Sequence, residues 1–264
     1  IAAALAFTMT VCGSSTAIAA SELTAESKPA TQYTIDANQE VYALLDFEDT
    51  TEFENATKGL LASPDTLDIC DENGKVVWSQ TAYAFLDQDA PDTANPSLWR
   101  NTQLNHIYGL FEVTDGIYQV RGYDMSNVTF IKGDTGWIVV DPLMSVECAQ
   151  AAFALVEENL GTFPVKAVIY SHSHVDHFGG VKGIVSEEEV QAGNVQVIAP
   201  EGFEKHAVSE NIYAGTAMGR RASYQYGTML EGGETGSLAI GIGMGQSKGI
   251  TSYISPTLEI TQTG

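Results

Sequence analysis

The chain has 264 residues, with 34 acidic and 12 basic side chains, a formal net charge of −22 and 44% hydrophobic residues. This length suits one large domain or two small ones, and the apolar content suffices for a packed core, which argues against a disordered chain or a coiled coil. The acidic balance leaves no basic stripe to neutralise phosphates, which argues against a nucleic-acid-binding surface and against docking on anionic lipid.

The N-terminal end has the amino-acid composition of a targeting segment. Residues 1–20 carry no charge and combine an apolar run with the small-residue sequence Ala17-Ile18-Ala19. This order is typical of a secretory signal peptide whose basic start would precede Ile1, so a secreted or periplasmic location is expected. A buried apolar strand or helix is the alternative. The two remaining cysteines, Cys70 and Cys148, cannot make a disulfide framework and are expected to be small core residues.

The region before residue 109 shows short elements only. Asn38–Leu45 and Glu52–Leu61 are typical of short helices. The turn residues Asp71–Gly74 predict a strand that begins at Val76. Asp87–Arg100 contains two prolines among several Asp and Asn residues, which predicts an ordered loop.

From Gly109 onward, β-rich runs are separated by short turns of Gly, Asp and Asn. Such spacing predicts a meander of antiparallel strands. The expected strands are Leu110–Val113, Ile117–Tyr123, Val128–Lys132 and Trp137–Val140.

Helices and buried strands are expected to alternate after the meander. Ser145–Leu160 places apolar residues on one helical face, with Ser145 as the N-cap. Val165–Tyr170 is a continuous apolar run, which is typical of a buried strand. A further strand at Val195–Ala199 follows another helical segment, and Glu201–Ser209 is expected to be helical. This order predicts an α/β sandwich.

The segment after the buried strand is rich in residues that can bind a metal ion. Three of the five histidines lie within six positions, at His172, His174 and His177, and Asp176 lies among them. Ligand sites on α/β sheets form at such strand ends. In extended geometry His172 and His174 point to the same side and can hold one metal, whereas Asp176 and His177 follow a turn and can face a second. Imidazole and carboxylate groups suit zinc, although a solvated histidine-rich loop is the alternative.

This pattern, H-x-H-x-D-H after a hydrophobic strand, resembles the signature of the metallo-β-lactamase superfamily. The fold that this resemblance implies is an αββα sandwich with one or two metal ions at the sheet edge. Asp141, which closes the strand Trp137–Val140, is similar to an upstream Asp that orients a ligand histidine in that superfamily. A turn-forming role before Pro142 is the alternative.

Four blocks in order also resemble the zinc-dependent alkyl sulfatases, which hydrolyse dodecyl sulfate and related esters. The blocks are Ala90–Arg100, Gly109–Asp124, Ser171–Gly180 and Ala207–Gly227. The resemblance implies cleavage of an alkyl sulfate ester to alcohol and sulfate at two zinc ions bridged by hydroxide. It also implies a homodimer of the full-length protein.

The resemblance assigns roles residue by residue. The implied metal ligands are His172, His174, Asp176 and His177, and Asp176 and Asp141 are the implied catalytic groups. The adjacent cations Arg220 and Arg221, together with Tyr224, are candidate contacts for the substrate. Solvated or salt-bridged surface positions are the alternative for the two arginines.

Two further Glu ligands and a later His ligand of such sulfatases would follow Gly264. The sequence is therefore expected to be an N-terminal fragment that is inactive alone. Residues 1–20 would be a partial signal peptide, 21–108 an N-terminal segment, and 109–264 the first part of a metallo-β-lactamase-like domain whose C-terminal half is missing. Two rival hypotheses remain: a hydrolase of the same fold that acts on a lactam or thioester, and a secreted metal-binding module without turnover.

A glycine-rich stretch, Gly232–Gly249, stands near the end of the chain. Gly241, Gly243 and Gly245 resemble part of a dinucleotide fingerprint, but no βαβ unit surrounds them and the spacing is wrong. We therefore expect a mobile or ligand-lining loop.

Overall fold

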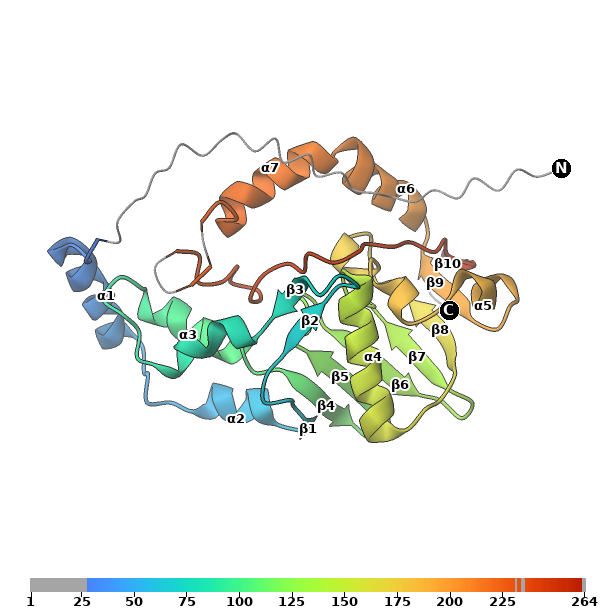
Figure 1. Ribbon diagram of the computed structural model, residues 1–264, viewed down its shortest axis with the longest axis horizontal. Coiled ribbons are helices and arrows are strands. Elements are labelled where there is room, and N and C mark those ends of the chain that lie inside the picture. Colours follow the sequence, from blue (N-terminus) through green and yellow to red (C-terminus); the bar gives the residue numbers. More distant parts are fainter. Residues whose placement is uncertain (1–27, 231, 234–235, 263–264) are drawn as a thin grey trace.

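The computed structural model describes residues 28–230, 232–233 and 236–262, so the expected signal peptide at 1–20 lies outside the described residues. Its centre is an eight-stranded mixed sheet in the order β1-β4-β5-β6-β7-β8-β9-β10 (Figure 1). The strands are β1 (Leu60–Ala62), β4 (Gly109–Thr114), β5 (Ile117–Arg121), β6 (Val128–Lys132), β7 (Trp137–Val140), β8 (Val165–Ile169), β9 (Gln196–Pro200) and β10 (Leu258–Ile260).

The sheet divides into an antiparallel half and a parallel half. Strands β4 to β7 form the predicted antiparallel meander. Strands β7, β8, β9 and β10 run parallel to one another. The expected α/β architecture is therefore confirmed, and the carboxyl ends of the parallel strands meet at one edge of the sheet.

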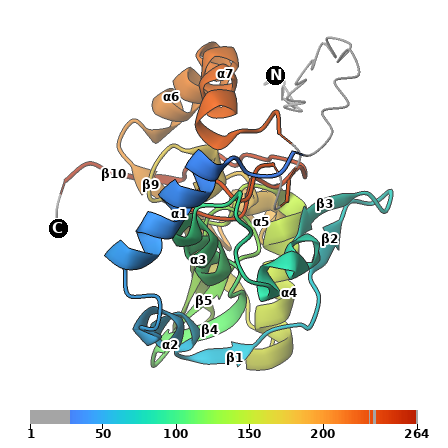
Figure 2. The same ribbon diagram turned by 90° about the vertical axis from the view of Figure 1, so that its left-hand side faces the viewer.

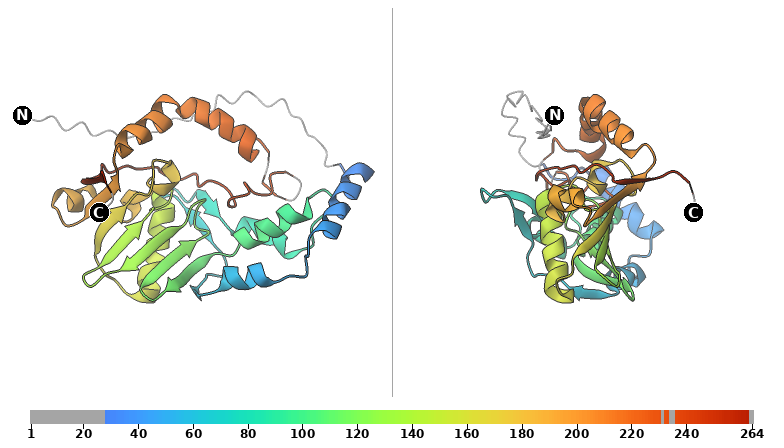
Figure 3. Two further views of the ribbon diagram at one scale, coloured as in Figure 1. Left: turned by 180° about the vertical axis from the view of Figure 1, so that it is seen from behind. Right: turned by 90° about the vertical axis from the view of Figure 1, so that its right-hand side faces the viewer.

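The α-helix α4 (Val146–Leu160) crosses from β7 to β8 and covers one face of the sheet, as the left panel of Figure 3 shows from behind. Its Cys148, Ala149, Ala152 and Val156 are fully buried. The ring of Phe153 stacks on Phe130 of β6 with centroids 5.8 Å apart. Burial of side chains of this kind contributes about 1.5–3 kcal/mol each, so this layer is the main core of the molecule.

The other helices are shorter. The crossover from β8 to β9 contains η3 (Val181–Gly183) and α5 (Glu187–Gln191), and a capping box between Ser186 and Glu189 starts α5. After β9, the chain forms α6 (Phe203–Val208), the π-helical turn η4 (Ser209–Tyr213) and α7 (Gly215–Tyr226). These three elements form an arch above the edge of the sheet where β8 ends (Figure 1). We call them the arch below.

The N-terminal elements flank the sheet and, with β1, extend it. They comprise α1 (Gln32–Leu44), α2 (Thr51–Thr57), η1 (Thr81–Asp87), α3 (Pro96–Asn105) and the two-stranded β2 (Asp68–Cys70) and β3 (Val76–Ser79). Figure 2 shows the β2–β3 pair on the same side of the sheet as α4. Strand β1 pairs with β4, so this segment contributes one strand to the main sheet.

Four expectations about these elements were wrong in detail. The predicted loop at Asp87–Arg100 contains the first half of α3, because Asn95 caps the helix by accepting from the N–H groups of Ser97 and Leu98. The second predicted helix ends at Thr57 instead of Leu61, because Gly59 turns the chain with a φ of +77° into β1. The first begins at Gln32 instead of Asn38, because Thr31 caps it.

The fourth concerns Cys70, which is exposed, whereas Cys148 is buried as expected. Ser145 occupies the predicted N-cap position of α4 but makes no capping hydrogen bond. Its hydroxyl instead accepts from Ser247 at 2.9 Å. Among the described residues, no helix is long and apolar enough to cross a bilayer.

Candidate metal centre

The histidine loop, which we define as Ser171–His177, begins where β8 ends, and Asp141 follows the neighbouring β7. The parallel register pairs Val140 with Ile169, and the N–H of Asp141 donates to the carbonyl of Ile169 at 2.9 Å. Asp141 and the histidine loop are therefore held side by side at the carboxyl edge of the sheet. This is the position that the sequence predicts for a ligand site.

Asp141 is the anchor of the loop. Its carboxylate accepts from the N–H and the hydroxyl of Ser171, both at 2.7 Å, and from Nδ1 of His177 at 2.9 Å. Its backbone adopts φ +56°, a left-handed conformation that Asp tolerates better than most residues. The side chain is only 14% exposed, so these three partners satisfy a nearly buried charge.

His177 is held between two carboxylates. Its Nδ1 contacts Asp141, and its Nε2 lies 3.1 Å from Oδ2 of Asp176. Burial lowers the pKa of His177, but the hydrogen bonds from Asp141 and Asp176 outweigh it and raise the pKa to about 9. Burial raises the pKa of Asp176, yet the bonded His177 prevails and the pKa is lowered. These two groups form an ion pair.

The other two rings complete the cluster. The ring centroid of His172 lies 4.6 Å from that of His174 and 4.1 Å from that of His177. Burial, followed by the neighbouring His177 and His174, lowers the pKa of His172. Nδ1 of His172 contacts the hydroxyl of Ser171 at 2.9 Å, and Nε2 of His174 contacts Glu210 at 3.2 Å.

The positions of the protons show which ring nitrogens of the three histidines have no hydrogen-bond partner. The hydroxyl of Ser171 donates to Asp141, so it accepts from Nδ1–H of His172. Nδ1–H of His177 donates to Asp141, and Nε2 of His174 lies 3.2 Å from Oε1 of Glu210. The ring nitrogens without such a partner are Nε2 of His172 and Nδ1 of His174. Nε2 of His177 is paired with Asp176, which is itself a candidate ligand. On each ring, one nitrogen is held by a group outside the candidate ligand set, which is the usual arrangement of a metal-binding histidine.

The donor set fits a metal of borderline softness such as zinc, although its members are not yet arranged around one point. Within residues 28–262, apart from the gaps named above, no three His, Cys, Asp or Glu side chains are placed so that they could already hold a metal ion. The separation of 3.1 Å between Asp176 and His177 is nevertheless close to that of two ligands on one zinc, about 3.4 Å for tetrahedral bonds.

Two residues that support the site escaped the sequence analysis. The hydroxyl of Ser126 donates to the backbone carbonyl of Asp176 and ties the histidine loop to the β5–β6 loop. Asp124 is only 3% exposed and accepts from Ser247, from the N–H of Met125 and from the N–H of Met144. Desolvation raises the pKa of Asp124 despite these bonds. Its position three residues after the end of strand β5 is its signal in the sequence.

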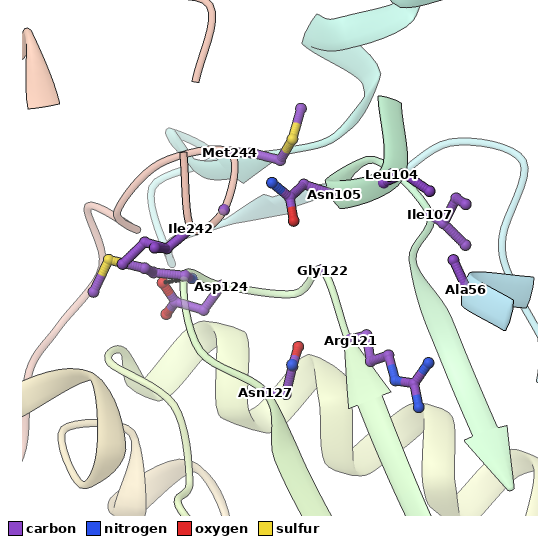
Figure 4. A pocket seen from close by; sticks show the side chains of 12 residues that line it. Ala56, Leu104, Asn105, Ile107, Arg121, Gly122, Asp124, Asn127, Ile242 and Met244 are labelled. Atoms are coloured by element: carbon purple, nitrogen blue, oxygen red, sulfur yellow. Dashed lines mark hydrogen bonds between the residues drawn. The ribbon is translucent and has the colours of Figure 1, made fainter. Parts of the chain in front are cut away.

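A cavity of about 160 Å³ lies beside Asp124 (Figure 4). The end of α3, the β5–β6 loop and the glycine-rich stretch surround it, with Asn105, Asn127 and Met244 among its lining residues. The glycine-rich stretch therefore lines a cavity, and its expected role as a mobile or ligand-lining loop stays a prediction.

The candidate substrate contacts lie apart from the histidine loop. Arg220, Arg221 and Tyr224 are exposed on α7, and the side chain of Tyr224 is 88% accessible. In the described part of the chain, no ion pair or hydrogen bond joins them to the loop. Glu210, in the turn η4 of the same arch, makes a contact with the loop that the sequence does not predict.

The chain is similar to proteins that are already known. Residues 121–246 match the model of the metallo-beta-lactamase superfamily. Over 240 residues the chain is 50% identical to a linear primary-alkylsulfatase of Pseudomonas sp., a match that covers 90% of this chain. Over 230 residues it is 47% identical to the alkyl/aryl-sulfatase BDS1 of Saccharomyces cerevisiae, which covers 87% of this chain.

A solved structure matches over the same span. The stereoselective inverting sec-alkylsulfatase Pisa1 from Pseudomonas sp. superposes with a TM-score of 0.85 at 48% identity over 90% of this chain. The chain spans 36% of the length of each of the two curated relatives and 38% of the solved chain. The match to this superfamily implies metal binding. By its sequence and its fold, this chain is similar to the metallo-β-lactamase superfamily and, within it, to the alkylsulfatases.

Proposed function

We propose that the whole protein is a zinc-dependent hydrolase that cleaves alkyl sulfate esters of the dodecyl sulfate type to an alcohol and sulfate. The observation that carries the proposal is the histidine loop, which brings three imidazole rings and the carboxylate of Asp176 together at the carboxyl edge of the sheet. The identity of 50% to a linear primary-alkylsulfatase supports a sulfate ester as the substrate.

In this proposal His172 and His174 bind one zinc ion, and Asp176 and His177 bind a second. Bound zinc supplies positive charge for the anionic ester and activates water by lowering its pKa. The residues of the chain prepare the site. Asp141 orients His177 and fixes the start of the loop through Ser171. The lowered pKa of Asp176 keeps its carboxylate anionic near neutral pH, as a ligand or a proton acceptor requires.

The substrate side of the proposal rests on charge. The ester is an anion, and the chain carries 34 acidic against 12 basic residues, so positive groups near the site matter. Arg220 and Arg221 lie in an α7 segment without acidic residues. They remain the proposed cationic contacts, with Tyr224 beside them. We further propose a secreted or periplasmic homodimer, on the character of residues 1–20 and on the family resemblance.

Hydrolysis assays of the whole protein test the proposal. We expect sulfate release from dodecyl sulfate, no hydrolysis of a β-lactam or a thioester, and about two zinc ions per chain by elemental analysis. The His174→Ala variant should lose activity by at least about 100-fold, because one ligand of a metal ion is removed. Hydrolysis of the lactam or thioester alone would identify a different enzyme of this fold. Zinc without any turnover would identify a metal-binding module.

A further inference from the structure

Glu210 reaches the histidine loop from an unusual turn of the arch. Residues Ser209–Tyr213 form a π-helical turn, closed by a hydrogen bond of 2.9 Å from the N–H of Ala214 to the carbonyl of Ser209. Such turns are rare and insert one extra residue into a helical path, which re-aims the side chains that follow. The turn joins α6 to α7 and lies above the carboxyl edge of β8 (Figure 1).

The contact is between Oε1 of Glu210 and Nε2 of His174, at 3.2 Å. The side chain of Glu210 is 25% exposed and that of His174 is 59% exposed, so His174 is far more open than His177 at 24%. His172 and His177 are each held by a partner at the base of the loop, Ser171 or Asp141. His174 has Glu210 as the partner of its Nε2, and that partner comes from a separate element.

We propose that Glu210 is a positioning residue, which accepts a hydrogen bond from Nε2–H of His174 and thereby directs Nδ1 of this ring toward the metal. The inference rests on the metal site of the proposed function. A carboxylate on the outer nitrogen fixes both the tautomer and the orientation of a ligand histidine and increases its basicity. An exposed ring without such a partner would have to give up rotational freedom whenever it binds metal.

The same contact couples the arch to the metal site. No residue of α7 is buried, and Glu210 is the arch residue whose side chain pairs with the histidine loop in the described part of the chain. A metal ion that fixes His174 therefore also fixes the position of Glu210. Metal binding should slow hydrogen exchange in the arch, Phe203–Tyr226, although no residue of the arch is a proposed ligand.

Metal affinity in the whole protein provides the first test, by competition for Zn²⁺ with a chromophoric chelator. Glu210→Ala should weaken affinity about 10- to 100-fold, as is typical when such a partner is removed. Glu210→Gln should restore most of that loss, because its amide oxygen still accepts from Nε2–H. Glu204→Gln is the matched control, since Glu204 is an exposed carboxylate at the beginning of the same arch. It should bind zinc as the wild type does.

Hydrogen exchange with and without Zn²⁺ is the second test. The arch should be protected by zinc in the wild type and in Glu204→Gln, but not in Glu210→Ala. Glu210→Ala affinity within twofold of the wild type would overturn the inference, as would an equal loss in the Glu204→Gln control. A wild-type protein that binds no zinc would refute the proposed function and this inference together. Zinc-binding wild type with an unaffected Glu210→Ala variant would refute this inference alone.

Discussion

At the scale of single residues, the site is organised by its supporting partners as much as by its proposed ligands. Asp141, Ser171 and Glu210 together fix one nitrogen on each of the three rings. Two of these partners lie next to the motif in the fold, at the ends of adjacent parallel strands. The sequence predicts Asp141 because it closes a recognisable strand. Glu210 has no such signal, since its role depends on how a distant arch folds back onto the loop.

A second feature at the residue scale is a half-buried histidine outside the site, His106. His106 ends α3, and its Nδ1 lies 2.8 Å from Oε1 of Gln80, which is fully buried. Nε2 of Gln80 in turn donates to the carbonyl of Gly122 at 2.7 Å. Burial lowers the pKa of His106, and this outweighs the attraction of Asp87. The ring is therefore a neutral hydrogen-bond donor that links α3 to the core.

This environment predicts a loss of stability in mild acid. Above the pKa of a free histidine, about 6.5, the ring is neutral in both the folded and the unfolded state. As the pH falls below that value, the unfolded chain binds the proton first, so the free energy of unfolding decreases until the pH reaches the lower folded pKa. Urea unfolding of the wild type between pH 7.5 and 5 should show this decrease.

The His106→Asn variant should lose less stability over the same pH range, because Asn can donate to Gln80 but cannot be protonated. The difference between the two curves isolates His106 from the other histidines. His206→Asn, at an exposed position of α6, is the control and should follow the wild type. Parallel curves for the wild type and His106→Asn would contradict the assignment of a half-buried neutral ring.

At the scale of elements, the strands were more predictable than the helices. The four meander strands and β8 agree with the sequence to within two residues, because each apolar run is bounded by turn residues. The sequence does not predict the helix α3, because Pro96 and Asn95 are typical of loops, although they are also residues that start a helix. The local pattern could not choose between these two uses. Burial of Trp99 in the core decides in favour of the helix.

The element after the histidine loop depends on close backbone packing. A Cβ atom on Gly180 would lie 2.2 Å from the carbonyl oxygen of Pro142 and 2.6 Å from that of Ser145. The two glycines that follow the motif thus let the chain pass against the loop that begins α4.

Gly180→Ala should therefore destabilise the protein by about 2 kcal/mol or more, since rigid backbone atoms cannot move away from the new methyl group. Gly219→Ala is the matched substitution inside α7, where a Cβ would meet no atom within 4 Å. It should stabilise by about 0.5–1 kcal/mol, because alanine favours a helix over glycine. Urea unfolding measures both values, and equal effects at the two positions would contradict this packing.

At the scale of the whole molecule, the sequence predicts the order of helices and strands but not which face of the sheet the helices cover. The α/β class and the crossover helix follow from periodicity. The path of the arch, and the return of β10 to pair with β9, depend on long-range contacts that no local pattern encodes. The left panel of Figure 3 shows a further asymmetry, because α4 covers one face of the sheet and no helix crosses the other face over β5 to β8 among the described residues.

Adjacent residues of β7 test this asymmetry. Val139 is fully buried on the face of α4, where it pairs with Phe130, and Ile138 is half-buried on the opposite face. Val139→Asp would place an unpaired carboxylate in the core and should cost this chain more than about 3 kcal/mol. Ile138→Asp should cost about 1 kcal/mol, because water reaches its side of the sheet.

Urea unfolding of this chain, with both variants measured under the same conditions, gives the comparison directly. Adjacent residues of a strand point to opposite faces of the sheet. The two variants therefore place the same residue at nearly the same point of β7, and they differ mainly in what covers the side chain. Equal losses at the two positions would mean that the second face is also packed. The same two variants can also be measured in the whole protein, since this chain spans 36% of the length of a curated relative. If further sequence covers the second face there, the cost of Ile138→Asp should rise toward that of Val139→Asp.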